Sequence, residues 1–244
     1  MDPDEQYSAG RFVEDTLRLI PRIHESGRTP LLVGGTGYYA RSFVFGLPDT
    51  PRSSPEIRRE IREKTAVLGL ESMHAELARV DPVAAKKIPI TDRYRIERAL
   101  EVYASSGTPV SSFSAPKVHR SDYRFLIIGL QRDRSDLYER INRRVEAMFR
   151  AGLIDETSRA LRSGYSANAP GLKSIGYREL VEMRGNGCDT VQSVTERIKR
   201  NTRRYAKRQL TYLRGFPGLE WYDANNVTGV VRRIEDFLGS WKSG

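Results

Sequence analysis

The sequence has little of what metal sites and covalent catalysis most often use. Its 244 residues include one cysteine, Cys188, and three histidines. A single cysteine excludes an intrachain disulfide and a cysteine-based zinc cluster. His24, His74 and His119 lack the spacing of metal ligands, so we assign no metal-ligating residue. No Gly-x-Ser-x-Gly elbow occurs and no lysine follows a glycine, which argues against that type of serine hydrolase and against a Walker A loop in this sequence.

Long apolar runs are also missing. The longest, at residues 31–33 and 125–130, have the length of strands and fall far short of the roughly 20 residues of a membrane span. Residues 1–5 are acidic and polar, unlike the basic start and apolar stretch of a secretory signal. We therefore expect no membrane segment, and a cytoplasmic protein.

Positive charge is abundant. Lys and Arg number 41 against 31 Asp and Glu, a formal charge of +10, and only 8 of the 41 are lysine, which leaves 33 arginines. Arginine forms paired hydrogen bonds with phosphate, so the bias favours nucleic acid or phosphorylated ligands. Composition alone is also compatible with a basic surface that only contacts solvent. The positions of the charges along the chain must therefore distinguish a phosphate-binding surface from a solvated one.

Periodicity and helix breakers predict an all-helical block between two regions with strand signals. Short strands of the buried type are expected at 29–33 and 123–130, with a further strand at 219–222. Ser8 is the expected N-cap of the first helix, which Pro21 should kink or shorten; Ser54 and Pro55 should begin the helix at 56–68. The other helices are expected at 38–45, 71–80, 83–87, 93–105, 137–152, 153–161, 174–183, 191–213 and 227–241.

The densest run of positive charge falls in the long helix expected at 191–213. On its outer face basic side chains crowd together without acidic partners after Glu196, and such repulsion is more easily tolerated if a polyanion neutralises it. We interpret this face as a phosphate-backbone footprint, with Gln209, Thr211 and the tyrosines available for polar or stacking contacts. The outer face is predicted to carry Arg200, Arg203, Arg204, Lys207, Arg208 and Arg214, and the inner face Ile198, Tyr205, Leu210 and Leu213.

A glycine-rich bend, Gly34-Gly35-Thr36-Gly37, follows the first expected strand. Glycines there would let the backbone approach a phosphate or substrate closely, and Thr36 would present its hydroxyl at the end of the sheet. An ordinary tight turn is the alternative.

Five stretches of the chain carry motifs, in this order: Asp2-Pro3-Asp4-Glu5-Gln6-Tyr7-Ser8-Ala9-Gly10, Leu32-Val33-Gly34-Gly35-Thr36-Gly37-Tyr38-Tyr39, Asp92-Arg93 with Arg98-Ala99-Leu100-Glu101-Val102, Ser174-Ile175-Gly176-Tyr177-Arg178-Glu179-Leu180, and Ala206-Lys207-Arg208-Gln209-Leu210-Thr211-Tyr212-Leu213-Arg214. Together they resemble the bacterial tRNA dimethylallyltransferases, also called isopentenylpyrophosphate transferases. The resemblance covers nearly the whole chain.

The resemblance implies an α/β fold with a P-loop kinase-like parallel sheet core and a helical insertion domain. The core would comprise residues 1–51 and, as the return strand and C-terminal helices, 116–244; the insertion at 52–115 would grip the tRNA anticodon arm. The implied reaction transfers a dimethylallyl group from dimethylallyl pyrophosphate, with Mg²⁺, to the exocyclic amine of the adenosine 3′ of the anticodon. A flipped base, aligned with the allylic carbon, and a stabilised pyrophosphate suit that chemistry. We expect a monomer.

The resemblance also implies roles for particular residues. Thr36 matches a reaction-centre threonine expected to contact the flipped adenosine or the leaving oxygen. Arg140 and Arg144, one helical turn apart, are our own candidates for the pyrophosphate, with helix-surface arginines as the alternative. The implied tRNA contacts are Arg58, Tyr94, Arg95, Ile96, Glu97, Arg98, Lys173, Ser174, Ile175, Gly176, Tyr177, Arg178, Lys207, Arg208, Gln209, Leu210, Thr211, Tyr212, Leu213 and Arg214.

One departure from the family pattern bears on activity. Family members begin with a strand, a Walker-type nucleotide-binding loop and a second strand that ends in the general-base Asp, whereas Met1 matches a position after these. We therefore expect an incomplete core. Two interpretations stay open: a transferase represented by a fragment or a misassigned start, and a catalytically inactive tRNA-binding protein. A phosphotransferase of similar core is a third alternative, disfavoured by the missing lysine loop.

Overall fold

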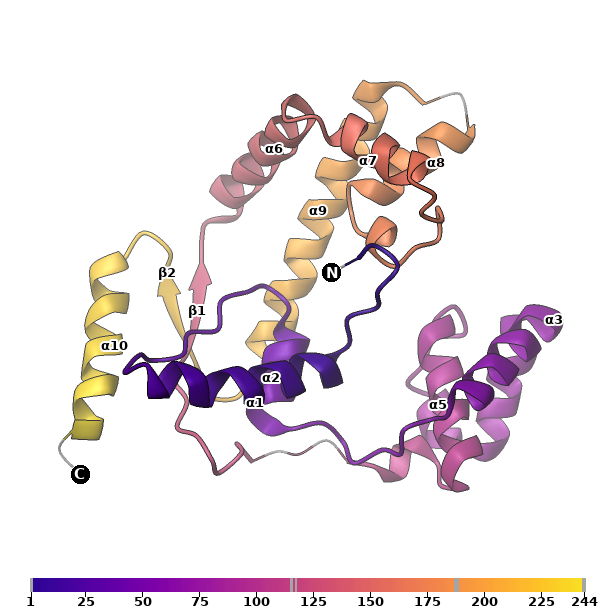
Figure 1. The fold of residues 1–244 in the computed structure, drawn as a ribbon, viewed down its shortest axis with the longest axis horizontal. Coiled ribbons are helices and arrows are strands. Elements are labelled where there is room, and N and C mark those ends of the chain that lie inside the picture. The colour runs from indigo at the N-terminus through magenta and orange to yellow at the C-terminus, as the bar shows by residue number, and fades with distance from the viewer. Residues whose placement is uncertain (1, 115, 117, 187–188, 243–244) are drawn as a thin grey trace. The chain divides into compact units, whose positions relative to one another are not determined.

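The computed structural model describes residues 2–114, 116, 118–186 and 189–242 and divides into two compact units (Figure 1). Unit 1 comprises residues 1–41 and 122–244, and unit 2 comprises residues 42–121. The chain thus leaves unit 1, forms unit 2 and returns, which is the connectivity of an inserted domain. The expected limits of the insertion, 52 and 115, both fall inside unit 2. Cys188 lies outside the described residues.

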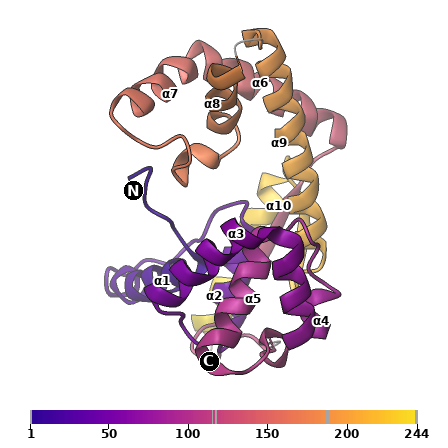
Figure 2. The same cartoon turned by 90° about the vertical axis from the view of Figure 1, so that its right-hand side faces the viewer.

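Unit 2 is helical, as the sequence predicts, and Figure 2 shows its helices packed together. Helix α3 (Pro55–Val80) bends at Gly69, where φ is 76°, so the two helices expected at 56–68 and 71–80 form one kinked element. α4 (Pro82–Ala85), α5 (Arg93–Ser106) and the 3₁₀ turn η1 (Val110–Ser112) follow. The fully or largely buried side chains of its core are Ile61, Met73, Leu77, Ala84, Ala85, Ile96, Ala99 and Leu100.

Side-chain caps fix the ends of these helices. Ser54 Oγ accepts the Ile57 N–H at 3.3 Å and Pro55 is the first residue of α3, which confirms the predicted cap. Asp81 is only 2% exposed; its Oδ1 accepts the Ala84 N–H at 2.9 Å and its Oδ2 the Ser111 N–H at 2.8 Å. Burial alone would raise the pKa of Asp81, but these hydrogen bonds hold it below its usual value. Asp81 therefore joins α4 to the segment that follows α5.

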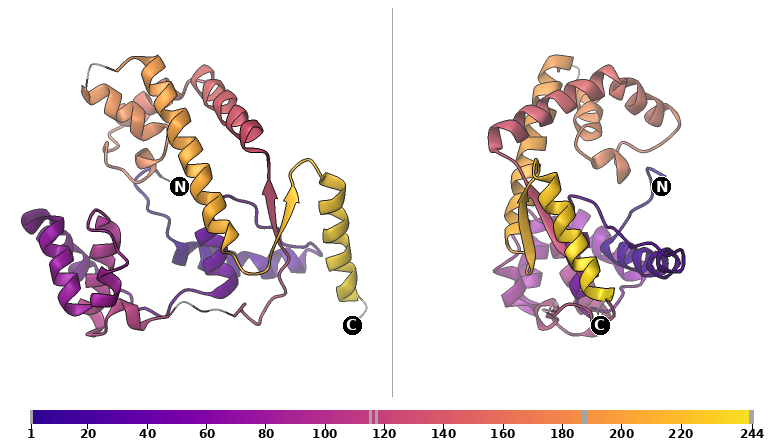
Figure 3. Two further views of the ribbon diagram at one scale, coloured as in Figure 1. Left: turned by 180° about the vertical axis from the view of Figure 1, so that it is seen from behind. Right: turned by 90° about the vertical axis from the view of Figure 1, so that its left-hand side faces the viewer.

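Four helices of unit 1 share a second core. They are α6 (Arg134–Arg150), α7 (Leu153–Arg162), α8 (Tyr177–Asn186) and the long α9 (Val191–Arg214), with the 3₁₀ turn η2 (Gly171–Lys173) before α8. Figure 3 shows α6 and α9 side by side. The buried side chains of this core, which come from all four helices, are Val145, Leu153, Leu180, Val194 and Ile198.

A two-stranded parallel sheet completes unit 1 together with α10 (Val227–Lys242). Strands β1 (Ile127–Gln131) and β2 (Leu219–Asp223) pair with Ile127 opposite Leu219. The Arg233 guanidinium of α10 holds Glu220 of β2 through two hydrogen bonds of 2.8 and 2.7 Å. The strand expected at 123–130 thus begins later, and it is not of the buried type, because Leu130 is 58% exposed.

The N-terminal part of unit 1 differs from the expected structure at residues 29–33. Residues 29–33 form no strand, and Leu31 and Val33 are 77% and 88% exposed, so the predicted buried strand is wrong for this structure. A strand needs neighbours to pair its backbone and cover its side chains, and this segment has neither here. The preceding helix α1 (Ala9–Glu25) is capped by Ser8 as predicted, and it runs through Pro21 without ending. Helix α2 (Gly37–Phe45) follows the glycine bend.

No helix among the described residues is both long and apolar enough to cross a membrane.

Candidate functional site

The glycine bend lies directly against the C-terminal half of α9. Gln209 Nε2 donates a hydrogen bond of 2.6 Å to the carbonyl oxygen of Gly35. A Cβ atom on Gly37 would lie 2.7 Å from Tyr212 Cδ1 and 3.0 Å from Leu213 Cδ2, so only glycine allows this approach. Two motifs about 170 residues apart in the chain therefore meet at one place.

Thr36 stands at the exposed edge of this contact. Its side chain is solvent-exposed, and its carbonyl oxygen accepts the Tyr39 N–H at 3.0 Å at the start of α2. At Tyr212, which lies against Gly37, burial raises the pKa of the hydroxyl, the charge of Arg41 acts in the opposite direction, and Tyr38 adds to the increase. The hydroxyl of Thr36 can thus face a ligand while the bend itself is held by α9.

The N-terminal motif packs against the same bend. Tyr39 Oη donates to the carbonyl oxygen of Tyr7 at 2.8 Å, and the rings of Phe12 and Tyr39 stack with centroids 5.2 Å apart. The motif also reaches the loop before α8, because the Gly171 N–H donates to Pro3 O at 2.9 Å. Three of the five motifs, all within unit 1, are therefore linked by direct contacts, and the N-terminal one also touches the turn that precedes the fourth.

The basic face of α9 agrees only in part with the helical projection. Arg200, Arg204, Lys207, Arg208 and Arg214 are exposed, and within the part of the chain that the structure describes none of them pairs with a carboxylate. Arg203 is different: its Nη1 donates to Asn142 Oδ1 at 2.6 Å and its guanidinium lies over the Tyr138 ring, so α6 occupies it.

Three polar or aromatic residues of α9 also differ from expectation. Tyr205 is 38% exposed instead of facing inward, and Arg208 lies over its ring at 5.7 Å. Gln209 is bound to the glycine bend, and Thr211 Oγ1 donates to Lys207 O within the helix. Leu210 and Leu213 are half-buried, in agreement with the projection.

The stretch from Lys173 to Arg178 forms the turn that leads into α8. Lys173, Ser174 and Arg178 are exposed, whereas Gly176 is buried with φ of 106°. Burial raises the pKa of Tyr177, whose hydroxyl donates to Glu156 at 2.8 Å. Ile175 packs against the α6–α9 core. Only part of this stretch can therefore touch a ligand with its side chains.

The two pyrophosphate candidates lie on α6. Arg140 Nε donates to Asp136 Oδ1 at 2.9 Å, and Asp136 also receives Arg132 at 3.1 Å. These arginines lower the pKa of Asp136. Arg144 is exposed without an ion pair to any described carboxylate. Arg140 would have to exchange a surface ion pair for phosphate, a small cost for an exposed pair.

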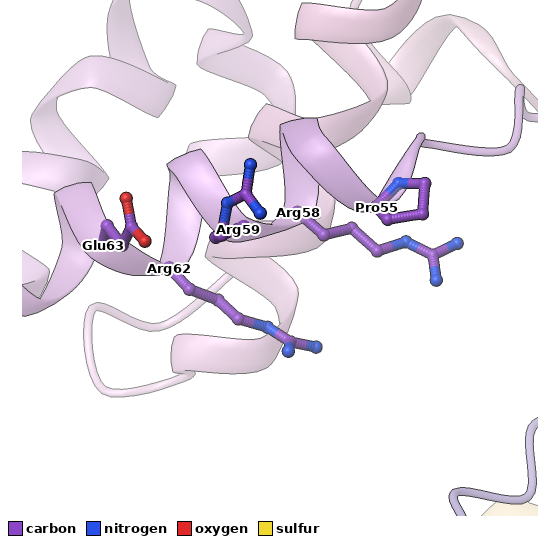
Figure 4. A pocket seen from close by; sticks show the side chains of 5 residues that line it. All are labelled: Pro55, Arg58, Arg59, Arg62 and Glu63. Atoms are coloured by element: carbon purple, nitrogen blue, oxygen red, sulfur yellow. The ribbon is translucent and has the colours of Figure 1, made fainter.

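In unit 2, Arg58 lies on the first turn of α3, in a shallow pocket with Arg59 and Arg62 (Figure 4). The side chains of Arg58 and Arg62, one turn apart, extend to the same side of the helix (Figure 4). Among the described residues none of the three guanidiniums pairs with a carboxylate. Arg59 and Arg62 were not among the predicted site residues, although Arg62, four residues after Arg58, is on the same helix face.

The stretch from Tyr94 to Arg98 is mixed. Tyr94 is 69% exposed and Arg95 is exposed, but Ile96 is fully buried in the unit 2 core, so its side chain cannot contact RNA. Glu97 is 9% exposed and accepts Arg93 Nε at 2.7 Å. Arg98 donates to Ser53 Oγ at 2.7 Å and to Pro51 O at 3.1 Å, which ties the 50–53 linker to α5. A contiguous stretch on a helix cannot present every side chain to one ligand, because α5 buries one face.

No three His, Cys, Asp or Glu side chains gather into a metal-binding group anywhere in the described part of the chain. Mg²⁺ commonly binds to one or two carboxylates together with waters and substrate phosphates. The absence of a three-residue group does not bear on such a site, and Mg²⁺ stays a prediction.

The motifs that the fold brings together are those of a known family. The model of the IPP transferase family matches residues 1–216. The chain belongs to this family. It is 40% identical over 230 residues to the tRNA dimethylallyltransferase of Geobacter sulfurreducens, covering 92% of this chain and 73% of that relative. It is likewise 40% identical over 237 residues to that of Syntrophobacter fumaroxidans, covering 96% of this chain and 68% of that relative.

Solved structures agree with this membership. The tRNA isopentenylpyrophosphate transferase of Bacillus halodurans is 34% identical with a TM-score of 0.63, over 98% of this IPP transferase chain and 75% of the other. A eukaryotic dimethylallyltransferase crystallised while acting on tRNA is 24% identical with a TM-score of 0.76, over 98% of this chain and 64% of the other, and shows the fold alone.

Proposed function

We propose that this IPP transferase modifies tRNA by moving a dimethylallyl group from dimethylallyl pyrophosphate to the exocyclic amine of the adenosine 3′ of the anticodon. The observation that carries the proposal is the contact between the Thr36 bend and the arginine-rich helix α9, made by Gln209 and Gly35 at 2.6 Å. The exposed Thr36 hydroxyl can contact a reactant, and the cations of α9 that pair with no described carboxylate can bind a polyanion on the same unit.

The reaction breaks the bond between the allylic carbon and a pyrophosphate oxygen, which keeps the electron pair. A new bond forms between that carbon and the amine nitrogen, which loses one proton. The amine is a weak nucleophile, so positioning of both reactants and stabilisation of the leaving pyrophosphate lower the barrier most. We assign Thr36 to contact the flipped base or the leaving oxygen, and Arg140 and Arg144 to the pyrophosphate.

The remaining contacts are assigned to the tRNA. In unit 1 the exposed cations of α9, with Lys173 and Arg178, are assigned to phosphates; in unit 2 Arg58, Tyr94 and Arg95 serve the anticodon arm. Phosphate contacts supply affinity and orientation, whereas the extruded adenine is selected by its pocket. Mg²⁺, a monomeric state and a cytoplasmic location stay predictions from the resemblance and the composition.

The experiment uses the 244-residue chain with an unmodified tRNA transcript, radiolabelled dimethylallyl pyrophosphate and Mg²⁺. Label in the tRNA at the adenosine beside the anticodon supports the proposal. Binding that falls steeply with salt, but without transfer of label, supports the alternative of an inactive tRNA-binding protein. Failure to bind tRNA at low salt contradicts both.

Arg208→Ala tests the assignment of α9. Since Arg208 is exposed and not ion-paired to a described residue, its loss should weaken tRNA binding uniformly across sequences and reduce the salt slope by about 1. Binding is measured by filter retention over a salt series. Arg18→Ala, at an exposed surface pair with Asp15 on α1, is the matched control and should leave the slope unchanged. An unchanged slope for Arg208→Ala contradicts the choice of this helix face.

A further inference from the structure

Glu179 is a fully buried carboxylate beside the predicted RNA-contacting turn of unit 1. It is 0% exposed, although it lies on the first turn of α8. Its Oε2 accepts the Gly176 N–H at 2.7 Å. Its Oε1 accepts two donors, Arg178 Nη2 at 2.9 Å and Asn201 Nδ2 of α9 at 2.8 Å. The carboxylate thus joins the turn, the helix start and α9.

Helix capping explains only one of these bonds. The third residue of a helix often accepts the N–H of the cap residue, and Gln does this as well as Glu. Burying a carboxylate instead of an amide costs several kcal/mol unless its charge is matched. Burial raises the pKa of Glu179, but the bonds from Asn201, Gly176 and Arg178 outweigh it and keep the pKa below its usual value. Capping alone therefore does not explain why a charged carboxylate, and not a neutral amide, occupies this buried position.

The exposed partner of that charge is Arg178. Its side chain is 47% exposed, and its Nε lies 3.9 Å from Glu182 Oε1. A guanidinium carries five N–H donors, and Glu179 takes one of them. The two carboxylates limit the rotamers of Arg178 before any ligand arrives, which reduces the conformational entropy that a later phosphate contact would cost. Gly176, with φ of 106°, is held in a turn that favours glycine by the same carboxylate.

We infer that Glu179 is a positioning residue for RNA: its buried carboxylate fixes the Gly176 turn and presents Arg178 to a phosphate of the bound tRNA. The inference rests on the proposed function, because it assumes that Arg178 contacts RNA. Glu179 itself is inaccessible and touches no ligand. It acts through Arg178, so the two side chains should be coupled in binding and each should lose its effect when the other is absent.

The test is a double-mutant cycle in the full chain, with an unmodified anticodon stem-loop RNA as the probe. Binding is measured over a salt series for wild type, Glu179→Gln, Arg178→Ala and the double variant, after circular dichroism has shown that each is folded. Glu146→Gln is the matched control, since Glu146 holds Lys199 of α9 at 2.8 Å but contacts none of the predicted RNA-binding residues.

We expect Arg178→Ala to weaken binding about tenfold and reduce the salt slope by about 1. Glu179→Gln should weaken binding about threefold to tenfold, and the double variant should bind no more than about twofold more weakly than Arg178→Ala alone. Glu146→Gln should bind like wild type. Wild-type affinity for Glu179→Gln, or full additivity in the double variant, overturns the inference.

A second variant keeps the test decisive if Glu179→Gln does not fold. Arg178→Lys retains the charge at an exposed position but lacks the planar fork that two carboxylates can orient. A loss of at least about threefold supports positioning, and wild-type affinity contradicts it. If wild type itself fails to bind the RNA, the proposed function is wrong; if wild type binds and only the cycle is additive, the positioning role alone is wrong.

Discussion

The helices of unit 2 and the segment before the glycine bend differ in how far their local sequence decides their structure. The helices expected between 56 and 105 form, down to the cap at Ser54, and enclose Leu77 and Ile96 at 0% exposure. Residues 31–33 have an equally apolar pattern, yet Leu31 and Val33 lie exposed outside any strand. A helix satisfies its backbone hydrogen bonds within itself, whereas a strand depends on a partner elsewhere in the chain.

The two regions are expected to serve different purposes, the unit 2 core stability and the glycine bend the reaction. The well-packed helical core contains residues whose loss should unfold the unit, whereas the exposed bend contains the residue assigned to the reaction. Thr36 lies within a few residues of Val33, in a segment held mainly by α2 and α9. We expect substitutions in the first region to change the free energy of unfolding and substitutions in the second to change turnover or docking of the bend.

The largest effect is expected from Leu77→Ala. The side chain is fully buried in the unit 2 core, so its loss should lower the free energy of unfolding by about 2–5 kcal/mol. Val33→Ala, at a side chain that is 88% exposed, is the control and should change it by less than about 0.5 kcal/mol. Urea unfolding followed by circular dichroism measures both. Equal losses would show that residues 31–33 are packed in solution.

Thr36→Ala should act on the reaction. If the hydroxyl supports the leaving oxygen or the base, turnover should fall by about 100-fold, with tRNA affinity within about twofold of wild type. Single-turnover transfer and equilibrium binding separate the two effects. A loss confined to affinity would show that Thr36 serves binding and that the catalytic assignment is wrong.

Gly37→Ala should disturb the contact between the bend and α9. Its Cβ would lie 2.7 Å from Tyr212 Cδ1, so the bend must shift, at a cost of about 1–3 kcal/mol. Gly34→Ala is the matched control, since a Cβ there meets no atom within 4 Å. Hydrogen exchange of α2 amides reports the loosening. Equal protection in the two variants would mean that the contact does not hold the bend.

The smallest effect is expected from Asp81→Ala in unit 2, at about 1–2 kcal/mol at pH 7, since Asp81 caps α4 and holds Ser111. The folded pKa of Asp81 lies below its unfolded value, so its charge contributes its full stabilisation at any pH above the unfolded pKa. That contribution is lost as the pH falls through the folded pKa. The difference in unfolding free energy between wild type and variant, from urea titrations, should shrink at low pH; a constant difference would contradict the role of the charge.

Most of the helices could be predicted from the sequence, because helix caps and helix breakers act through neighbouring residues. Ser8 and Ser54 cap the helices they were expected to cap. Fewer of the site residues were predicted correctly, because a helical projection ignores the neighbouring helices. Arg203 donates a hydrogen bond to Asn142 of α6, and Tyr205 faces outward. Ile96 lies within a contiguous predicted tRNA-contacting stretch, yet its side chain is buried in the unit 2 core.

The amino-acid sequence by itself determined the helical insertion, the basic face of α9 and the membership of the family, because periodicity, charge and motif order are properties of neighbouring residues. Tertiary structure alone decided that Gln209 holds the bend of Thr36, that Glu179 is buried beneath Arg178 and that residues 31–33 stay unpaired. These contacts join segments far apart in the chain. Whether a strand finds a pairing partner, or a buried charge a hydrogen-bond donor, depends on the tertiary packing and cannot be read from neighbouring residues.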